Sequence, residues 1–461
     1  MKLACLLKPA LIALALIGAP LASAACLSVE VESNNSERHA NTALCSGAGV
    51  SGTIGSRRDE DWFRIDVATP GMVTVSLAHD SGIDLEWYLS KAGGSVLTYR
   101  STLDNPEAGT FNVGAAGAYY VRVKSQTGIG RYTVNVSFPA ADGGGGGGSG
   151  TQACTLPRKV NLGKTGNSTP KPSVTSGGVV LMGGGLDVDE AIQWMIARSG
   201  GGDFVILRSS GTNAYNDYIY AMGGVNSVQT LLVTSTTQAN DACVVQTIRN
   251  AGAVFLAGGD QADYINYFKG QGVGDALNYL INTKRAPVGG TSAGMAIQGQ
   301  YFHPGGADNT TVLLNPTAVT IGNNFLANAS LTQLVTEPHF AQRARQPRLT
   351  SFLASSIYNY GVPWQTMRGI AADENTAVAV DSANLGKVFG SGNAHFVMAT
   401  GAPETLAPSA ALTWFVGSQA LKVFQVGGTA AGTNTFNLGT WSGATGATHY
   451  WHVNNGKLTI N

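Results

Sequence analysis

The fold is decided by a short stretch in which an apolar run ends in two glycines and a serine follows between small residues. The stretch reads Ala286-Pro287-Val288-Gly289-Gly290-Thr291-Ser292-Ala293-Gly294-Met295. This order predicts a strand, a sharp turn and a helix. A serine on such a turn is a candidate nucleophile, because the helix N-terminus and the next backbone N–H face the oxyanion that forms after attack. The alternative is a solvated serine in a glycine-rich turn, which a chain with 61 glycines can contain by chance.

The composition indicates a globular protein of two or three domains without net charge. The chain has 461 residues, 28 Lys and Arg balance 28 Asp and Glu, and 12% of the residues are charged. That length allows a large buried core. Without a net charge or a basic cluster, nothing favours nucleic acid or an anionic membrane surface as a partner. Low charge and high glycine content favour a secreted bacterial protein.

Residues 1–24 predict a secretory signal peptide, so we expect Gram-negative-type export and an extracellular protein. Two lysines precede an apolar run at 10–17, and Ala22-Ser23-Ala24 matches a small-residue cleavage signature. Cys26 raises a lipoprotein alternative, which the serine of that signature disfavours because lipoprotein signals usually carry an aliphatic residue there. No other stretch is apolar for the length that a membrane span needs.

The cysteines that remain after signal removal predict two disulfides. They are Cys26, Cys45, Cys154 and Cys243, an even number in an oxidising compartment. Of the three connectivities, sequence proximity favours Cys26 with Cys45 and Cys154 with Cys243. The sequence has no C-x-x-C pair and no histidine cluster at metal-ligand spacing, so we predict no metal site.

Residues 25–140 predict a small antiparallel β-sandwich, because apolar and polar residues alternate in runs separated by turn signals. The apolar positions are Phe63, Ile65, Val67, Val73, Val75, Leu77, Tyr119, Val121, Val123, Tyr132, Val134, Val136 and Phe138. The motifs Asp61-Trp62-Phe63, Gly117-Ala118-Tyr119-Tyr120-Val121-Arg122-Val123 and Gly130-Arg131-Tyr132-Thr133-Val134 resemble the bacterial pre-peptidase C-terminal domain, an accessory module of secreted hydrolases. The resemblance implies attachment, targeting or maturation; a passive stabilising role is the alternative.

A Gly-rich linker at 141–150 separates this domain from a second domain at 151–461. There, short apolar runs alternate with helical stretches, which predicts an α/β fold with a parallel sheet covered on both faces. The predicted strands include Val179-Val180-Leu181-Met182, Phe204-Val205-Ile206-Leu207, Leu231-Leu232-Val233 and Val254-Phe255-Leu256; the predicted helices include 242–250, 264–268 and one capped by Asp187 or Asp189. Beyond Gly401 the chain becomes β-rich, and we expect Trp441, Tyr450 and Trp451 to pack between strands rather than grip a polymer.

Three glycine loops follow predicted strands, at 183–185, 258–261 and 290–294. Loops at the carboxyl ends of parallel strands form the usual site of such folds. None of the three has the spacing of a phosphate-binding loop, so we predict neither a nucleotide nor another cofactor.

His339 is the best candidate for the base that activates Ser292. It follows a predicted strand and precedes Arg343, Arg345 and Arg348 in a chain otherwise poor in charge. Three arginines beside a base indicate an anionic or carboxylate-bearing substrate, and the alternative is a helical face with solvated charges.

Asp373 and Glu374 are the candidates for the acid that orients the base. The two acids lie between apolar runs in the segment 369–378. Either carboxylate could hold the imidazole in the tautomer that accepts the serine proton.

Four motifs in this order resemble the S51 serine peptidases and, among them, the extracellular cyanophycinases. They are Gly258-Gly259-Asp260-Gln261, Gly290-Thr291-Ser292-Ala293-Gly294, His339-Phe340 with Arg343, Arg345 and Arg348, and Asp373-Glu374-Asn375-Thr376-Ala377. The resemblance implies a class I glutamine-amidotransferase-like α/β fold and a Ser-His-Glu triad. It also favours a homodimer, since relatives of this fold often pair.

Carried over by motif, the resemblance implies that Ser292 is the nucleophile, His339 the base and then the acid, and Glu374 the orienting acid. The backbone N–H of Ala293, with one from the loop of Gly258, Gly259 and Asp260, would form the oxyanion hole. The substrate pocket would be lined by Asp260, Gln261, Glu337, Arg343, Arg345 and Arg348. The family commonly has Asp-Gln before the base, whereas this chain has Glu337-Pro338, a departure that concerns substrate placement rather than the triad.

The substrate that the resemblance implies is cyanophycin, a polyaspartate with arginine on each β-carboxyl group, cleaved to β-Asp-Arg dipeptides through an acyl-enzyme. One alternative is an S51 peptidase that acts on soluble aspartyl dipeptides, and another is a secreted binding protein with a decayed catalytic domain. An α/β-hydrolase esterase shares the serine turn, but its triad runs serine, acid, histidine, and the HGGG-type loop is missing here.

Overall fold

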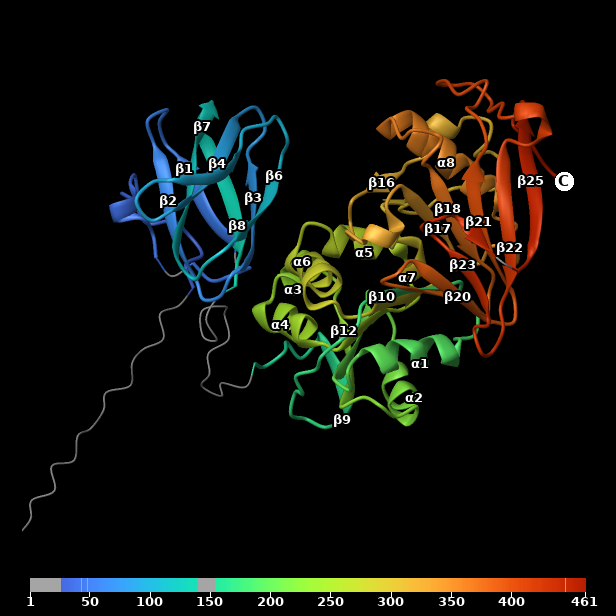
Figure 1. Ribbon diagram of the computed structural model, residues 1–461, viewed down its shortest axis with the longest axis horizontal. Coiled ribbons are helices and arrows are strands. Elements are labelled where there is room, and N and C mark those ends of the chain that lie inside the picture. Colours follow the sequence, from blue (N-terminus) through green and yellow to red (C-terminus); the bar gives the residue numbers. More distant parts are fainter. Residues whose placement is uncertain (1–25, 43, 48, 140–153, 444) are drawn as a thin grey trace, which may run out of the picture. The chain divides into compact units, whose positions relative to one another are not determined.

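The computed structural model describes residues 26–42, 44–47, 49–139, 154–443 and 445–461. The predicted signal peptide at 1–24 and linker at 141–150 lie outside these residues. The chain divides into two compact units, Met1–Ala153 and Cys154–Asn461 (Figure 1). No described helix has the length and apolar character needed to cross a membrane.

The first unit is a sandwich of two antiparallel four-stranded sheets, as predicted (Figure 1). Its sheets have the strand orders β1-β8-β3-β6 and β2-β7-β4-β5. The strands are β1 Gly49–Ile54, β2 Glu60–Val67, β3 Gly71–His79, β4 Asp84–Lys91, β5 Val96–Arg100, β6 Glu107–Val113, β7 Gly117–Thr127 and β8 Gly130–Ser137, after a 3-10 turn, Glu37–His39. The alternating apolar residues all point into one core, and Cys26 is bonded to Cys45, as sequence proximity favoured.

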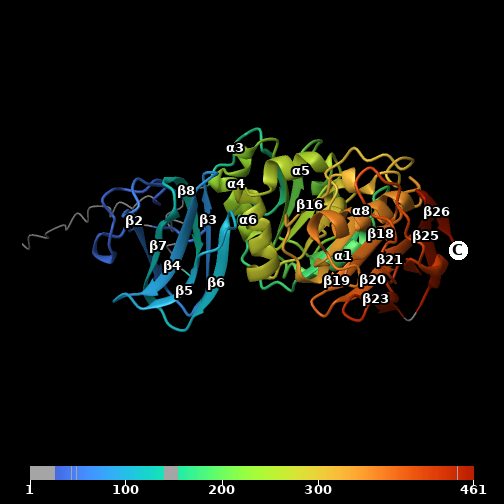
Figure 2. The same ribbon diagram turned by 90° about the horizontal axis from the view of Figure 1, so that it is seen from above.

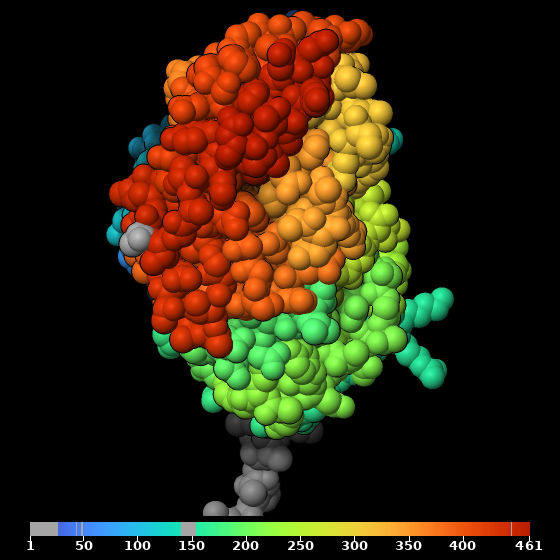
Figure 3. All heavy atoms as spheres, turned by 90° about the vertical axis from the view of Figure 1, so that its right-hand side faces the viewer, coloured from blue at the N-terminus to red at the C-terminus, as the bar shows by residue number. Residues whose placement is uncertain are grey.

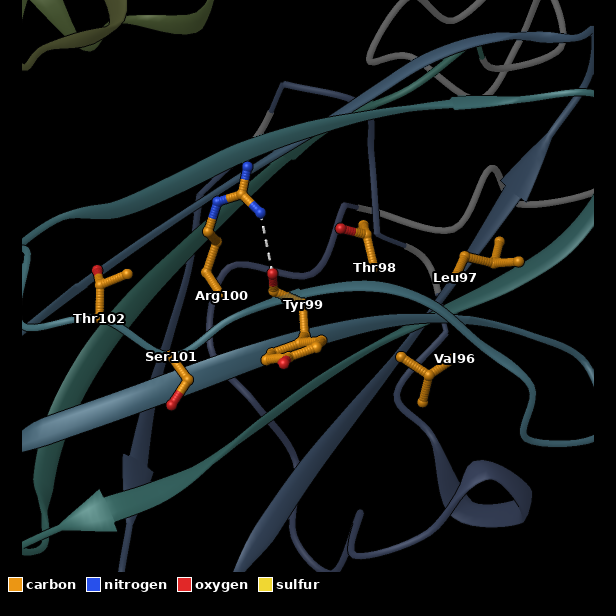
Figure 4. A pocket seen from close by; sticks show the side chains of 7 residues that line it. All are labelled: Val96, Leu97, Thr98, Tyr99, Arg100, Ser101 and Thr102. Carbon is orange, nitrogen blue, oxygen red and sulfur yellow. Dashed lines mark hydrogen bonds between the residues drawn. The ribbon is translucent and has the colours of Figure 1, made fainter.

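A shallow hollow runs along β5, the last strand in the order of its sheet (Figure 4). It is lined by the consecutive residues Val96, Leu97, Thr98, Tyr99, Arg100, Ser101 and Thr102. The Tyr99 ring stacks on Tyr88 with centroids 5.4 Å apart, and an Arg100 Nη1 donates to the Tyr99 carbonyl. The lining contains no acid, histidine or cysteine, so this hollow offers no acid–base or nucleophilic chemistry.

The second unit is built on a ten-stranded sheet with the order β24-β23-β20-β19-β10-β14-β13-β11-β12-β9. Its strands are β9 Asn161–Gly166, β10 Gly178–Met182, β11 Asp203–Arg208, β12 Ser227–Leu232, β13 Ala253–Leu256, β14 Val288–Thr291, β19 Thr376–Asp381, β20 Leu385–Gly390, β23 Asn434–Asn437 and β24 Ser442–Gly443. The central strands β10, β14, β13, β11 and β12 are parallel, as predicted, and both flanks are antiparallel. Cys154, at the start of this unit, is bonded to Cys243, as predicted.

Helices cover both faces of the parallel strands. Alternate residues of each strand point to opposite sides of the sheet, so each strand packs apolar side chains against both helical layers. Val254 and Leu256 contact one helical layer, whereas Phe255 contacts the other (Figures 1 and 2). The helices are α1 Asp189–Arg198, α2 Tyr215–Ala221, α3 Thr236–Ala239, α4 Ala242–Asn250, α5 Gln261–Phe268, α6 Gly272–Tyr279, α7 Ala293–Ala296 and α8 Gln346–Tyr360. The predicted cap of α1 is wrong: Val188 is the N-cap residue without a side-chain bond, and Asp187 accepts a hydrogen bond from Tyr215 instead.

A second sheet of eight strands was not foreseen as a separate layer. Its order is β16-β15-β17-β18-β21-β22-β25-β26. The strands are β15 Tyr301–Phe302, β16 Gly322–Asn323, β17 Leu334–Glu337, β18 Arg368–Ala372, β21 Asn393–Ala399, β22 Leu421–Gly427, β25 Ala447–Asn454 and β26 Lys457–Ile460. Figure 3 shows the C-terminal residues, in red, spread over one face of this unit.

The second sheet packs between α8 and the first sheet. Phe352 of α8 belongs to a core with Val335 and Val397, whereas Leu181 of the first sheet belongs to another with Ile370 and Phe396. Trp441 and Trp451 are buried, which confirms their packing role, and Tyr450 is half-buried. This packing brings the carboxyl ends of β17 and β18 beside those of β10 and β14.

A carboxyl group is buried inside the first unit. Asp61 is fully buried, and the Tyr132 hydroxyl lies 2.6 Å from its Oδ2 and 2.8 Å from Glu30 Oε2. One phenolic proton cannot be donated to both oxygens at once, so a proton on Asp61 satisfies the group. Burial, reinforced by Glu30, raises the pKa of Asp61 to about 8.

We expect the stability of the first unit to fall as the pH rises. The Asp61 pKa is raised from 3.8 in the unfolded chain to about 8, so folding takes up a proton between these values. Asp61→Asn stays neutral, and its stability advantage over the wild type should grow by up to about 1.4 kcal/mol per pH unit in that window. Calorimetric melting of the wild type and of Asp61→Asn across this pH range measures the difference in stability. Asp66→Asn, an exposed acid of the same strand, is the control and should show no such trend.

Candidate active site

Ser292 lies on a strained turn between β14 and α7. Its φ is 54° and its ψ is −115°, a conformation that non-glycine residues rarely adopt. The flanking glycines are required by space: a Cβ on Gly290 would lie 2.7 Å from the Gly294 carbonyl carbon, and a Cβ on Gly294 would lie 2.0 Å from the Leu256 carbonyl oxygen. The Ser292 N–H donates to the Met182 carbonyl at 3.1 Å, which ties the turn to β10. The serine side chain is therefore held in one place above the sheet.

His339 follows β17 and points at this serine. Its Nε2 lies 2.7 Å from Ser292 Oγ. The backbone at His339 is also left-handed, with a φ of 49°, and its N–H donates to the Gly183 carbonyl at 2.7 Å. The imidazole is therefore in hydrogen-bond contact with the candidate nucleophile before any substrate binds.

Glu374, in the loop after β18, lies on the other side of the imidazole. Its Oε1 is 2.6 Å from His339 Nδ1, and its backbone N–H donates to Gln342 Oε1 at 2.9 Å. Of the two acids that sequence reasoning left open, Glu374 contacts His339, whereas Asp373 points toward His395. A carboxylate at Nδ1 fixes the tautomer in which Nε2 accepts the serine proton.

The loop 183–185 holds this histidine and this acid in place. A Cβ on Gly184 would lie 2.3 Å from His339 Cε1, and a Cβ on Gly185 would lie 2.8 Å from Glu374 Cβ. Gly184 and Gly185 also have φ values of 96° and 76°, which glycine adopts without strain. Asn375 donates from its N–H to the Gly184 carbonyl at 2.8 Å. Sequence reasoning placed this loop at the correct end of the sheet but assigned it no role.

Electrostatics keep His339 neutral near physiological pH. Burial lowers the pKa of His339 below its usual 6.5, and Arg343 and Arg345 lower it further. The hydrogen bond that His339 Nδ1 donates to Glu374 opposes this shift of the pKa without cancelling it. A neutral imidazole can accept a proton, so the group is suited to act as a general base.

Backbone donors for an oxyanion lie beside Ser292. The N–H of Ala293 is the first of α7 and has no acceptor within that helix. A Cβ on Gly258 would lie 3.5 Å from Ser292 Cβ, so the loop after β13 passes directly beside the serine. Gly259 lies in the same loop against the hydroxyls of Ser209 and Ser210.

Asp260 and Gln261 lie in the predicted loop after β13, and both also make contacts within the protein. Asp260 is exposed and caps α5 by accepting the Ala262 N–H at 2.9 Å. Gln261 Nε2 donates to the His303 carbonyl at 3.0 Å. The two residues begin α5 next to the loop that passes Ser292.

The expectation that Glu337 contacts substrate is not supported by its position. Glu337 is fully buried, and its Oε1 lies 3.1 Å from one guanidinium nitrogen each of Arg345 and Arg348. Burial raises the pKa of Glu337 despite these arginines, and burial lowers the pKa of Arg345 to about 10. Only Arg343 of the three arginines is exposed. The two guanidinium groups of Arg345 and Arg348 outnumber the single carboxylate of Glu337, so this cluster near His339 carries an excess of positive charge.

The first unit contains the one group among the described residues with metal-ligand spacing. One carboxylate oxygen each of Glu30, Glu32 and Asp61 lie within 4.8 Å of one another. Such oxygens suit a hard cation such as Ca²⁺. The protonated Asp61 described above also accounts for the close approach of these acids, so an ion is not required to explain it.

Sequence reasoning did not single out His395. His395 Nε2 lies 3.3 Å from Asp373 Oδ1. It also missed Gln342. No local sequence signal marks either contact, because each joins segments that meet only after the second sheet has formed.

Two segments of the chain match models of known protein families. Residues 209–387 match the model of Peptidase family S51, and residues 59–125 match the model of the bacterial pre-peptidase C-terminal domain. A cyanophycinase from Nostoc sp. (strain PCC 7120 / SAG 25.82 / UTEX 2576) is 24% identical over 190 residues, which are 41% of this chain and 59% of that protein. The match thus spans about three fifths of this curated relative.

Two solved structures are each similar to part of the chain. A peptidase from an acI-B1 Actinobacterium is 16% identical, covers 49% of this chain and 91% of its own, and has a TM-score of 0.36. The pre-peptidase C-terminal domain of a collagenase from Bacillus anthracis is 22% identical, covers 21% of this chain and 94% of its own, and has a TM-score of 0.19.

We expect Gly184→Ala to slow the reaction of Ser292 by about 100-fold, because the new methyl group displaces the imidazole. The measurement is the rate of covalent labelling by a fluorophosphonate probe. Gly223→Ala is the matched control, since Gly223 has a φ of 76° but no atom within 4 Å of its Cβ position. Equal labelling rates in the two variants would show that the loop does not constrain His339.

Proposed function

We propose that this protein is a secreted serine-type peptidase that hydrolyses cyanophycin to β-Asp-Arg dipeptides through an acyl-enzyme on Ser292. The observation that carries the proposal is the continuous contact from Ser292 Oγ to His339 Nε2 and from His339 Nδ1 to Glu374 Oε1, at 2.7 and 2.6 Å. The S51 domain and the similarity to curated cyanophycinases support it.

In the proposed mechanism, Ser292 Oγ attacks a backbone carbonyl of the polymer while His339 Nε2 takes its proton. Glu374 stabilises the imidazolium that forms, and the N–H of Ala293, with one from the loop 258–260, binds the oxyanion. His339 then gives the proton to the leaving amine, which leaves an ester on Ser292. Water, deprotonated by His339, attacks this ester, and His339 then returns the proton to Ser292 Oγ as the product with the new carboxyl group leaves.

The charge distribution supports a substrate that carries both signs. Each repeat of the proposed polymer offers an aspartyl-derived carboxylate and a guanidinium. Arg343 is exposed near His339, and half-buried Arg345 with buried Arg348 leaves a positive charge in excess over Glu337. On the other side of Ser292, exposed Asp260 offers an acceptor for the guanidinium.

We assign residues 1–24 as a signal peptide for export. To the first unit we assign an accessory role without catalytic chemistry. Two disulfides, Cys26–Cys45 and Cys154–Cys243, are consistent with an oxidising compartment. The pre-peptidase C-terminal domain agrees with a secreted enzyme.

A second candidate is hydrolysis of soluble aspartyl dipeptides by the same residues. It is favoured by one observation: Glu337, which stands where the family commonly has aspartate, is sequestered by two arginines. Glu337 is therefore not free to bind a guanidinium group of the substrate. A smaller substrate with fewer cationic groups would need fewer acidic partners in the protein.

The test is to incubate the mature protein with cyanophycin granules and to identify soluble products by mass spectrometry. Wild type should release β-Asp-Arg, and Ser292→Ala, His339→Ala and Glu374→Gln should each lower the rate, by about 10⁴-fold for the serine and histidine variants. Intact granules together with cleaved aspartyl dipeptides would select the second candidate. Failure of the wild type to react with a fluorophosphonate probe would indicate a binding protein instead.

A further inference from the structure

Asp373 stands next to Glu374 in the chain but makes an entirely different set of contacts. It is 3% exposed. Its Oδ1 accepts the Ala341 N–H at 3.1 Å and lies 3.3 Å from His395 Nε2. Its Oδ2 accepts the Asn393 N–H at 3.0 Å and lies 3.3 Å from Asn393 Nδ2. Each oxygen of this buried carboxylate therefore has two donors.

These contacts join the segments that carry the base and the acid. Ala341 belongs to the turn that begins at His339, and Asp373 immediately precedes Glu374. Two backbone bonds run alongside: the Phe340 N–H donates to the Ala372 carbonyl at 3.1 Å, and the Asp373 N–H donates to the Asn393 carbonyl at 3.0 Å. His395, on β21, also packs its ring against Phe340 with centroids 4.8 Å apart. Asp373 and His395 thus hold the turn from two sides.

The turn needs such support because its backbone is strained. His339 has a φ of 49°, which persists only where surrounding contacts enforce it. Charge-assisted bonds are the strong ones, and Asp373 supplies one to the turn at Ala341. Burial by itself would raise the pKa of Asp373, but His395 and the N–H groups of Asn393 and Ala341 bring it below its usual value. The carboxylate therefore stays ionised at neutral pH.

We propose that Asp373 and His395 form a positioning pair that sets the distance between His339 and Glu374. Neither residue contacts the reacting atoms; both act through the turn 339–341 and the loop that carries Glu374. The inference rests on the proposed function, since it assigns a purpose to the pair only if His339 is the base. It extends that function to two residues outside the Ser-His-Glu contact.

Asp373→Asn tests the pair. The amide keeps the shape but turns one acceptor into a donor, which then faces the N–H of Ala341 or Asn393. We expect kcat to fall by about 10- to 100-fold with KM near the wild-type value, because a small misplacement of the base weakens proton transfer. The acid limb of the kcat/KM profile should also move to lower pH. The hydrogen bond that His339 donates to Glu374 raises the pKa of His339. When that bond is loosened, the lowering of the pKa by burial, Arg343 and Arg345 is less opposed.

The matched control is Asp381→Asn. Asp381 likewise accepts two backbone N–H groups in a turn, from Ala383 at 2.9 Å and Leu385 at 3.0 Å, but it lies at the far end of β19 from the Glu374 loop. It should keep the wild-type kcat and pH profile. The final stoichiometry of fluorophosphonate labelling counts the folded, active molecules in each preparation, so kcat is stated per active site.

His395→Gln provides a second test if Asp373→Asn does not fold. It changes the contact to Asp373 without touching the backbone bonds, and it should shift the acid limb in the same direction by a smaller amount. A wild-type pH profile and kcat per active site in whichever of the two variants folds would overturn the positioning role. If the wild type itself neither labels nor hydrolyses, the proposed function fails instead, so the two failures are distinguishable.

Discussion

The close contact between the loop 183–185 and His339 constrains the rest of the second unit. A Cβ at Gly184 would lie 2.3 Å from the imidazole, so this loop, the turn after β17 and the loop after β18 have to pack with almost no space between them. Such packing holds only if the strands that end in these loops are themselves held rigidly. The first sheet supplies β10 and β14, and the second supplies β17 and β18.

This arrangement requires strained backbone conformations at both reacting residues. Ser292 and His339 have φ values of 54° and 49°. Strain at such positions persists where neighbouring contacts over-determine the conformation. Those contacts are visible here as the bonds from Ser292 to Met182, from His339 to Gly183 and from Ala341 to Asp373. The apolar core between the two sheets, which includes Leu181 and Ile370, fixes the strands behind them.

The charged groups behind the site have a structural as well as an electrostatic effect. Glu337, Arg345 and Arg348 form a buried ion cluster beneath the turn that carries His339. A buried charge is tolerated when it is paired, and Arg345 of this cluster, together with Arg343 outside it, favours the neutral form of the nearby imidazole. The same arginines that sequence reasoning assigned to substrate thus help to set the state of the base.

Much of this protein could be predicted from local sequence. The alternation of Phe63, Ile65 and Val67 predicted a sandwich, and the turn around Ser292 predicted a nucleophile, because both patterns depend on neighbours in the chain. The choice of Glu374 over Asp373 came only from the family resemblance, and the burial of Glu337 and the pairing of His395 could not be predicted from local sequence. Each depends on which segments meet across the two sheets. The sequence by itself indicated the sandwich, the central parallel strands, the favoured disulfide pairs and the candidate residues; only the tertiary structure decided the second sheet and which side chains face one another, because both follow from long-range packing.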